Sequence, residues 1–402
     1  MSPLLIFLQE STFPQTPSIN ESPNVNVGQI TAQVSRSIAV ELPSVSGLRK
    51  NIQRQRLCSN PQLLTPKTLS ELVIPEQFQL TNNGENFILK DSSARANRYV
   101  VFGTMGNLRR LGSCRIWMSD GTFSSVSSIF KQLYTIHGGL VDNDNAGNNA
   151  IESVPFVYVL LPCKRQNVYR RFLKALVNVA DGHLVPEVFT TDFEAAFIGA
   201  VKKVFPDTHL HGCYFHFAQC IVRFLNNMGL ETRYNTDDEF SLHAKMLIAL
   251  AFVPPAFVVA GFTSLISSEY FANTNDLKPL ITYFQDTWIG VQRRNGHTSA
   301  KFPIETWNCY YVVINNEPRT NNMMEGWHNT FHQRIGRSYE QLGKFINALR
   351  VEQASSEVIW EQFNAGRLVA TRKRKKYFGY DARIRGGGIL EYLRGVAHSV
   401  SP

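Results

Sequence analysis

The chain has 402 residues, 44% of them hydrophobic, which is enough for two or three structural units around at least one substantial core. Lys and Arg number 41 against 32 Asp and Glu, and this formal charge of +9 favours a polyanionic partner. The six scattered cysteines argue against a secreted disulfide scaffold, and Pro254-Pro255 breaks the apolar stretch Met246 to Phe262, which argues against a membrane-spanning helix there.

Residues 1–98 are predicted to be an N-terminal lead-in, helical or partly disordered, because most of this region is rich in Ser, Pro, Asn and Gln. From Tyr99 onward, apolar runs bounded by turn residues predict buried strands, and helical spacing then alternates with further strands. The strands are expected at 99–102, 114–118, 133–136, 154–161, 187–191 and 210–217, with helices at 166–180 and 195–205. An antiparallel start followed by alternating helix and strand is typical of a mixed α/β sheet, which we assign to residues 99–217.

The second half of the chain is predicted to interrupt and then complete this sheet. Helices alone are expected from Ala218 to Gln292, inside an all-helical insertion at 218–305. Residues 306–366 are expected to complete the core, with a helix from Asn322 to Ile335 followed by a long amphipathic one.

The last predicted segment, residues 367–402, is a basic tail. From Gly366 to the end the sequence has nine basic and two acidic residues. Five adjacent cations repel each other and are expected at the surface; they are Arg372, Lys373, Arg374, Lys375 and Lys376. This run predicts a nuclear-import signal or a clamp for nucleic-acid phosphates, with a merely solvated surface run as the alternative.

Three acidic residues occupy positions that suit a metal site. Asp120 and Asp192 each follow a predicted strand, and Glu325 lies in the first turn of a predicted helix. Carboxylates that converge at one sheet edge supply the hard oxygen ligands that Mg²⁺ prefers. Structural alternatives stay open, since Asp120 before Gly121 could be a turn residue and Asp192 a helix N-cap. Glu325 could instead complete a capping box with Asn322.

Cys213 and His216 form a Cys-x-x-His pair that offers two potential zinc ligands. A structural zinc site needs four ligands, and no second Cys/His pair stands at a suitable distance. Residues 1–98 contain Cys58 and no histidine, so a Cys/His finger cannot form within them. We therefore expect no zinc finger.

Seven segments, in order and with matching spacing, resemble the Mutator-like transposase family. They are Trp117 to Phe123, Phe130 to Gly138, Thr191 to Ala196, Phe205-Pro206, Gly212 to Phe217, Ala249 to Pro254 and Arg319 to Asn329. By this resemblance Asp120 and Asp192 match the two catalytic aspartates, and Glu325 matches the glutamate that follows a helical insertion. Cys213 and His216 match the family's Cys-x-x-His signature and would support the active site, with His328 as a further supporting residue.

The resemblance implies a ribonuclease-H-like core that cleaves and joins DNA strands with Mg²⁺ or Mn²⁺. Asp120 would bridge two ions, while Asp192 and Glu325 would each hold one. The implied partners are transposon ends and target DNA in the nucleus, with no membrane and with a homo-oligomer as an option. Two other functions stay open: a domesticated, non-catalytic nuclear DNA-binding or regulatory protein, and a carboxylate-pair hydrolase such as a glycosidase.

Overall fold

A computed structural model describes most of the chain beyond residue 65. The described residues are 66–93, 97–123, 126, 128–141, 151–293, 296–315, 317–336, 341–366 and 388–399. The chain separates into two compact units, residues 1–63 and 64–402, and all of the described residues belong to the second. The first part of the predicted lead-in and the basic run 372–376 lie outside the described residues.

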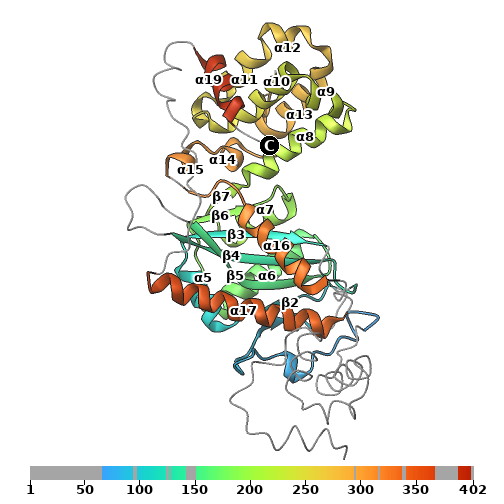
Figure 1. The fold of residues 1–402 in the computed structure, drawn as a ribbon, viewed down its shortest axis with the longest axis vertical. Helices are drawn as coiled ribbons and strands as arrows, with labels where there is room; N and C mark the ends of the chain where they lie inside the picture. Colours follow the sequence, from blue (N-terminus) through green and yellow to red (C-terminus); the bar gives the residue numbers. More distant parts are fainter. Residues whose placement is uncertain are drawn as a thin grey trace, which may run out of the picture. The chain divides into compact units, whose positions relative to one another are not determined.

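A seven-stranded mixed sheet in the order β1-β2-β5-β4-β3-β6-β7 organises the second unit (Figure 1). The strands are β1 Ile88–Asp91, β2 Val100–Phe102, β3 Ile116–Thr122, β4 Gln132–Val141, β5 Ile151–Leu161, β6 Val188–Thr191 and β7 His209–Gly212. β3, β4 and β5 pair antiparallel, whereas β6 lies parallel to both β3 and β7. The predicted α/β class with a mixed sheet is confirmed.

Five helices in the described part of the chain pack against the sheet. Successive side chains along each strand point to opposite faces, so both faces offer side chains for this packing. The helices are α5 Met105–Ser113, α6 Gln166–Val179, α7 Ala195–Val204, α16 Asn322–Ile335 and α17 Leu342–Asn364. Aromatic rings from α6 and α7 pack on one face, where the Tyr134 and Phe197 ring centroids lie 4.6 Å apart. On the other face Met324 of α16 packs against Ile116, Met118 and Val188. The α16 helix thus lies on the same face of β3 as the even-numbered side chains.

A helical block that also contains one short hairpin separates β7 from α16 (Figure 1). Its elements are α8 Tyr214–Asn227, α9 Glu231–Thr236, α10 Asp238–Ala249, η2 Leu250–Phe252, α11 Pro255–Ile266, α12 Glu269–Asn273, η3 Asn275–Leu277, α13 Lys278–Phe284, η4 Gln285–Ile289, α14 Ile304–Trp307 and α15 Tyr310–Ile314. As expected, Pro254-Pro255 divides the apolar stretch Met246 to Phe262. A helix tolerates proline only in its first turn, and α11 accordingly begins at Pro255. Within the described residues, every helix is too short or too polar to span a membrane.

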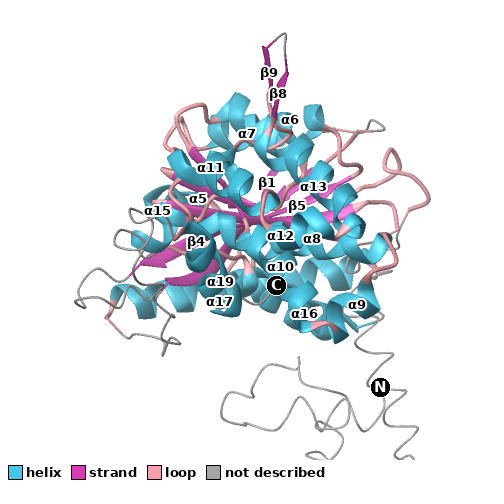
Figure 2. Cartoon of the chain, turned by 90° about the horizontal axis from the view of Figure 1, so that it is seen from above, coloured by secondary structure: helices cyan, strands magenta, loops and turns pink. Residues whose placement is uncertain are grey.

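Two predicted boundaries in this region were wrong. The strand expected to reach Phe217 ends at Gly212, and α8 begins at Tyr214 because its buried residues follow helical spacing. The segment expected to be purely helical up to Gln292 ends in a small hairpin, β8 Val291–Arg293 paired with β9 Gly296–Thr298. Figure 2 shows this hairpin extending beyond the neighbouring helices.

Four elements lie where the sequence patterns indicated none. The predicted lead-in contains a short turn, η1 Glu76–Phe78, and the edge strand β1. Helix α5 follows β2 directly, with Thr104 capping its first turn by accepting a hydrogen bond from the Asn107 backbone N–H. Within the predicted tail, α19 Ile389–Ser399 packs on the helical block, where the Tyr392 hydroxyl donates to the Phe252 carbonyl at 2.9 Å.

Candidate active site at the carboxyl edge of the sheet

The register of two parallel strands places Asp120 beside Asp192. Met118 of β3 lies opposite Thr190 of β6, and continuing this register by two residues brings Asp120 opposite Asp192. Because side chains repeat every two residues along a strand, Asp120 belongs to the face on which Met118 contacts α16, while Asp192 directly follows the last residue of β6. One sheet edge therefore carries both predicted aspartates.

Asp120 lies within β3. It does not lie in a turn after the strand, which was the structural alternative that the sequence left open. β4 continues to pair with β3 as far as Thr122, opposite Leu133, so the strand extends beyond the predicted end. The Gly121 backbone N–H donates to Asp120 Oδ1 at 2.7 Å. Asp192 is likewise not the N-cap of α7, because that position belongs to Glu194. The alternatives in which Asp120 is a turn residue and Asp192 is a helix N-cap are therefore wrong.

Glu325 approaches the same edge from α16. The helix begins at Asn322 with Asn321 as its N-cap residue, so Glu325 is the fourth helical residue and the Asn322 to Glu325 capping box does not form. Its carboxylate instead faces α8, where Glu325 Oε1 lies 3.6 Å from His216 Nε2. The helical block thus returns the chain to the sheet with Glu325 near the aspartates.

Asn321 fixes the start of α16 against the strand that carries Asp120. Its buried side-chain amide donates to the Ser119 carbonyl at 3.3 Å, and its backbone N–H donates to Cys213 Sγ at 3.2 Å. The Cys213 backbone N–H donates in turn to the Thr191 carbonyl at 2.8 Å. Burial raises the pKa of the Cys213 thiol to about 11, so this group is a neutral acceptor at neutral pH. Cys213 therefore joins the segments that carry all three acids.

A histidine stands beside each of two acidic residues. His328 Nδ1 lies 3.4 Å from Asp120 Oδ2, and its Nε2 lies 3.3 Å from Thr135 Oγ1, with the ring buried. His216 stands beside Glu325 as described above. Contacts on both ring nitrogens fix the orientation of His328, and through it that of the Asp120 carboxylate.

The three carboxylates influence one another electrostatically. Burial, followed by the charges of Asp120 and Glu194, raises the pKa of Asp192 to about 6. Burial raises the pKa of Glu325 as well, and the Asp120 charge adds to this while His216 opposes it. Among the described residues, no three Asp, Glu, His or Cys side chains stand close enough together to form a ready-made metal site. The arrangement is a cluster of repelling acids held near one another.

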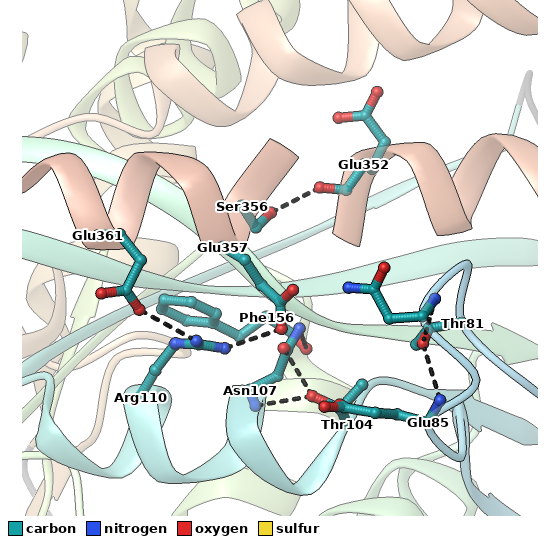
Figure 3. A network of polar contacts seen from close by, with 11 residues as sticks. Thr81, Glu85, Thr104, Asn107, Arg110, Phe156, Glu352, Ser356, Glu357 and Glu361 are labelled. Carbon is teal, nitrogen blue, oxygen red and sulfur yellow. Dashed lines mark hydrogen bonds and ion pairs between the residues drawn. The ribbon is translucent and has the colours of Figure 1, made fainter. Parts of the chain in front are cut away.

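Helix α17 anchors α16 through side-chain contacts. Buried Glu352 accepts a hydrogen bond from Trp327 Nε1 at 2.8 Å and pairs with Arg334, so two α16 residues on either side of His328 are anchored. α17 is itself attached to α5, where Arg110 contacts Glu357 at 3.0 Å and Glu361 at 3.3 Å (Figure 3). The contacts of Trp327 and Arg334 with Glu352 therefore help to fix α16, and with it Glu325.

Sequence reasoning missed Asn321, Thr135 and Glu194 as parts of this site. Glu194 lies two residues after Asp192, inside a segment that carried the family resemblance, and that proximity was the available signal. Asn321 and Thr135 also lie inside segments that carried the family resemblance, but their contacts with the site are made with partners distant in sequence.

The comparison with protein families agrees with this region of the fold. Residues 116–220 match the MULE transposase domain, a segment that includes Asp120, Asp192, Cys213 and His216. This match confirms the resemblance to Mutator-like transposases that the sequence motifs indicated. No curated protein matches the chain. Glu325 lies outside the matched segment, and its placement rests on the contacts of α16.

Proposed function

We propose, from the MULE transposase domain that residues 116–220 carry, that this protein cleaves DNA phosphodiester bonds and joins strands with Asp120, Asp192 and Glu325 as its catalytic acids. The observation that carries the proposal is the parallel register of β3 and β6, which aligns the two aspartates at one edge. The formal charge of +9 is consistent with a DNA partner.

A ribonuclease-H-like core is part of this proposal. Its support is the order β5-β4-β3-β6-β7, in which an antiparallel three-stranded start is followed by two parallel strands. In open sheets with parallel strands, ligands bind outside the carboxyl ends of the strands. The helical block then acts as an insertion before the helix that bears the third acid.

The donor chemistry of the acids fits a divalent cation. Burial and the charge of Asp120 raise the pKa of both Asp192 and Glu325, so the acids form a site of excess negative charge, which a hard cation would neutralise. We propose that Asp120, Asp192 and Glu325 hold Mg²⁺ or Mn²⁺. A bound ion would supply Lewis-acid stabilisation of the phosphoryl oxygens and activate a water or DNA 3′-hydroxyl.

The chain's own residues would orient these ligands. His328 and the Gly121 N–H hold the Asp120 carboxylate, while Asn321 and Cys213 fix the distance between β3 and the start of α16. We infer that His216, His328 and Cys213 are positioning residues, because the two histidines contact Glu325 and Asp120 and Cys213 contacts Thr191 and Asn321 beside the acids.

The test is nicking of supercoiled plasmid DNA with Mg²⁺, with Mn²⁺ and with EDTA. We expect nicking that either metal supports, that EDTA abolishes and that Asp120→Asn removes. DNA binding without nicking would contradict the proposed enzymatic activity and favour a domesticated, non-catalytic DNA-binding protein. Metal-independent hydrolysis of a glycoside would instead favour a carboxylate-pair hydrolase.

A nuclear location is a further part of the proposal, carried by the five basic residues at 372–376. A fluorescent fusion of the full chain is expected to lose most of its nuclear enrichment when all five become alanine. The matched control changes five separate surface lysines and arginines to alanine. Enrichment that survives the first change would rule out an import signal in this run and leave a phosphate clamp or a solvated surface.

A further inference from the structure

Three side chains outside the proposed acids gather at the same sheet edge. β3, β5 and β6 end there in the same direction, since β3 and β5 are both antiparallel to β4 and β6 is parallel to β3. Phe123 follows β3, Lys164 follows β5 and Glu194 follows β6. Lys164 Nζ lies 3.1 Å from Glu194 Oε2 and 4.1 Å from the centroid of the Phe123 ring. Phe123 is three residues beyond Asp120.

Lys164 and Phe123 are accessible, whereas Glu194, which pairs with Lys164, is largely buried. The side chain of Lys164 is 43% exposed and Phe123 is 46% exposed, against 13% for the Glu194 side chain. An ammonium group has three N–H donors, and Glu194 accepts only one of them. The remaining donors of Lys164 can reach an incoming ligand beside the acids.

A purely structural role accounts poorly for this group. Single exposed aromatic rings are common, and an exposed ion pair or cation–π contact contributes little to stability. Here, however, the cation pairs with Glu194, which lies two residues after Asp192 and whose charge acts on it, and such carboxylates would repel a phosphate backbone. A cation at this position offsets that repulsion where a polyanion must approach.

We propose that Lys164 and Phe123 form a subsite for the DNA strand next to the cleaved or joined bond. Lys164 contacts a backbone phosphate, Phe123 stacks on an unpaired base beside it, and Glu194 is a positioning residue that orients the ammonium. This inference rests on the proposed function, because it assumes that DNA reaches the acids.

The phosphate contact is tested by the salt dependence of DNA binding, measured with a fluorescent duplex of random sequence in EDTA. Each phosphate contact contributes about 0.9 to the slope of log K against log salt. We expect Lys164→Gln to lower the slope by about that amount and Lys164→Arg to restore it. Lys202→Gln, which changes an exposed lysine on α7, is the matched control and is expected to leave the slope unchanged.

The stacking contact is tested with the same duplex carrying a single-stranded 3′ overhang. Phe123→Leu is expected to weaken binding to the overhang about tenfold and to leave blunt-duplex binding unchanged, while Phe123→Tyr keeps the ring and the affinity. Thermal melting of each variant verifies that the fold is retained.

The outcomes separate the two proposals. Failure of the unchanged protein to bind DNA at all would overturn the proposed function and the subsite with it. Normal binding by the unchanged protein, with the same slope for Lys164→Gln as for Lys202→Gln, would overturn the phosphate contact alone. Equal loss of overhang and duplex binding by Phe123→Leu would contradict stacking on an unpaired base.

Discussion

Replacing Glu325 by glutamine is expected to reduce metal-dependent DNA cleavage by about 10³-fold or more. Loss of a charged metal ligand removes several kcal/mol of stabilisation of the reacting phosphate, and each 1.36 kcal/mol is a factor of about ten in rate. Glutamine keeps the size and helix propensity of the residue, so α16 should remain intact. Single-turnover nicking of plasmid DNA in Mg²⁺ measures the effect.

The matched control for this substitution is Glu361→Gln on α17. Glu361 is exposed and pairs with Arg110 of α5 at 3.3 Å, and because an exposed ion pair contributes little to stability, its replacement is expected to leave cleavage unchanged. The metal-free Glu325→Gln protein should melt at or above the temperature of the unchanged protein, because one repelling carboxylate is removed. Retained cleavage would remove Glu325 from the catalytic group and leave the third acid unassigned.

The sequence predicted those parts of the site that local patterns encode. Short apolar strands ending in an acid located Asp120 and Asp192, and helical periodicity located the helix of Glu325. The predicted helix from Asn322 to Ile335 is observed with these bounds, and because Asn321 is its N-cap residue the capping-box alternative no longer applies. In the same way, the pairing of β3 with β4 moved Asp120 from a turn into a strand.

The remaining parts depend on tertiary pairing that no local pattern carries. The contact of His328 with Asp120 joins residues from β3 and α16, and the amide of Asn321 reaches Ser119 across a similar separation in sequence. The edge strand β1 was missed because it is short and ends in two charged residues, and its position comes from antiparallel pairing with β2. Such contacts become visible only once the strand order is known.

Replacing Asp192 by asparagine is expected to stabilise the metal-free protein at pH 7.5 by up to about 3 kcal/mol. The pKa of Asp192 is raised from 3.8 to about 6, first by burial and then by Asp120. Since the folded pKa exceeds the unfolded one, this group's favourable contribution is present below about pH 4 and is lost as the pH rises to about 6. Each unit by which the folded pKa exceeds the unfolded pKa lowers the free energy of unfolding by about 1.36 kcal/mol at pH values above both. Asparagine does not ionise, so the substitution removes this penalty.

The pH and metal dependence of melting distinguish this cause from a general packing effect. The gain of Asp192→Asn should be large at pH 7.5 and nearly absent at pH 4, whereas Asp207→Asn, at an exposed position beyond α7, should show no such change. Added Mg²⁺ should raise the melting temperature of the unchanged protein, because a ligand that binds only the folded state stabilises it in proportion to RT ln(1 + [L]/Kd). The difference in melting temperature between Asp192→Asn and the unchanged protein should then become smaller. A gain that is the same at both pH values would contradict the repulsion between Asp192 and Asp120, and an unchanged protein that does not respond to Mg²⁺ would contradict cation binding by this cluster.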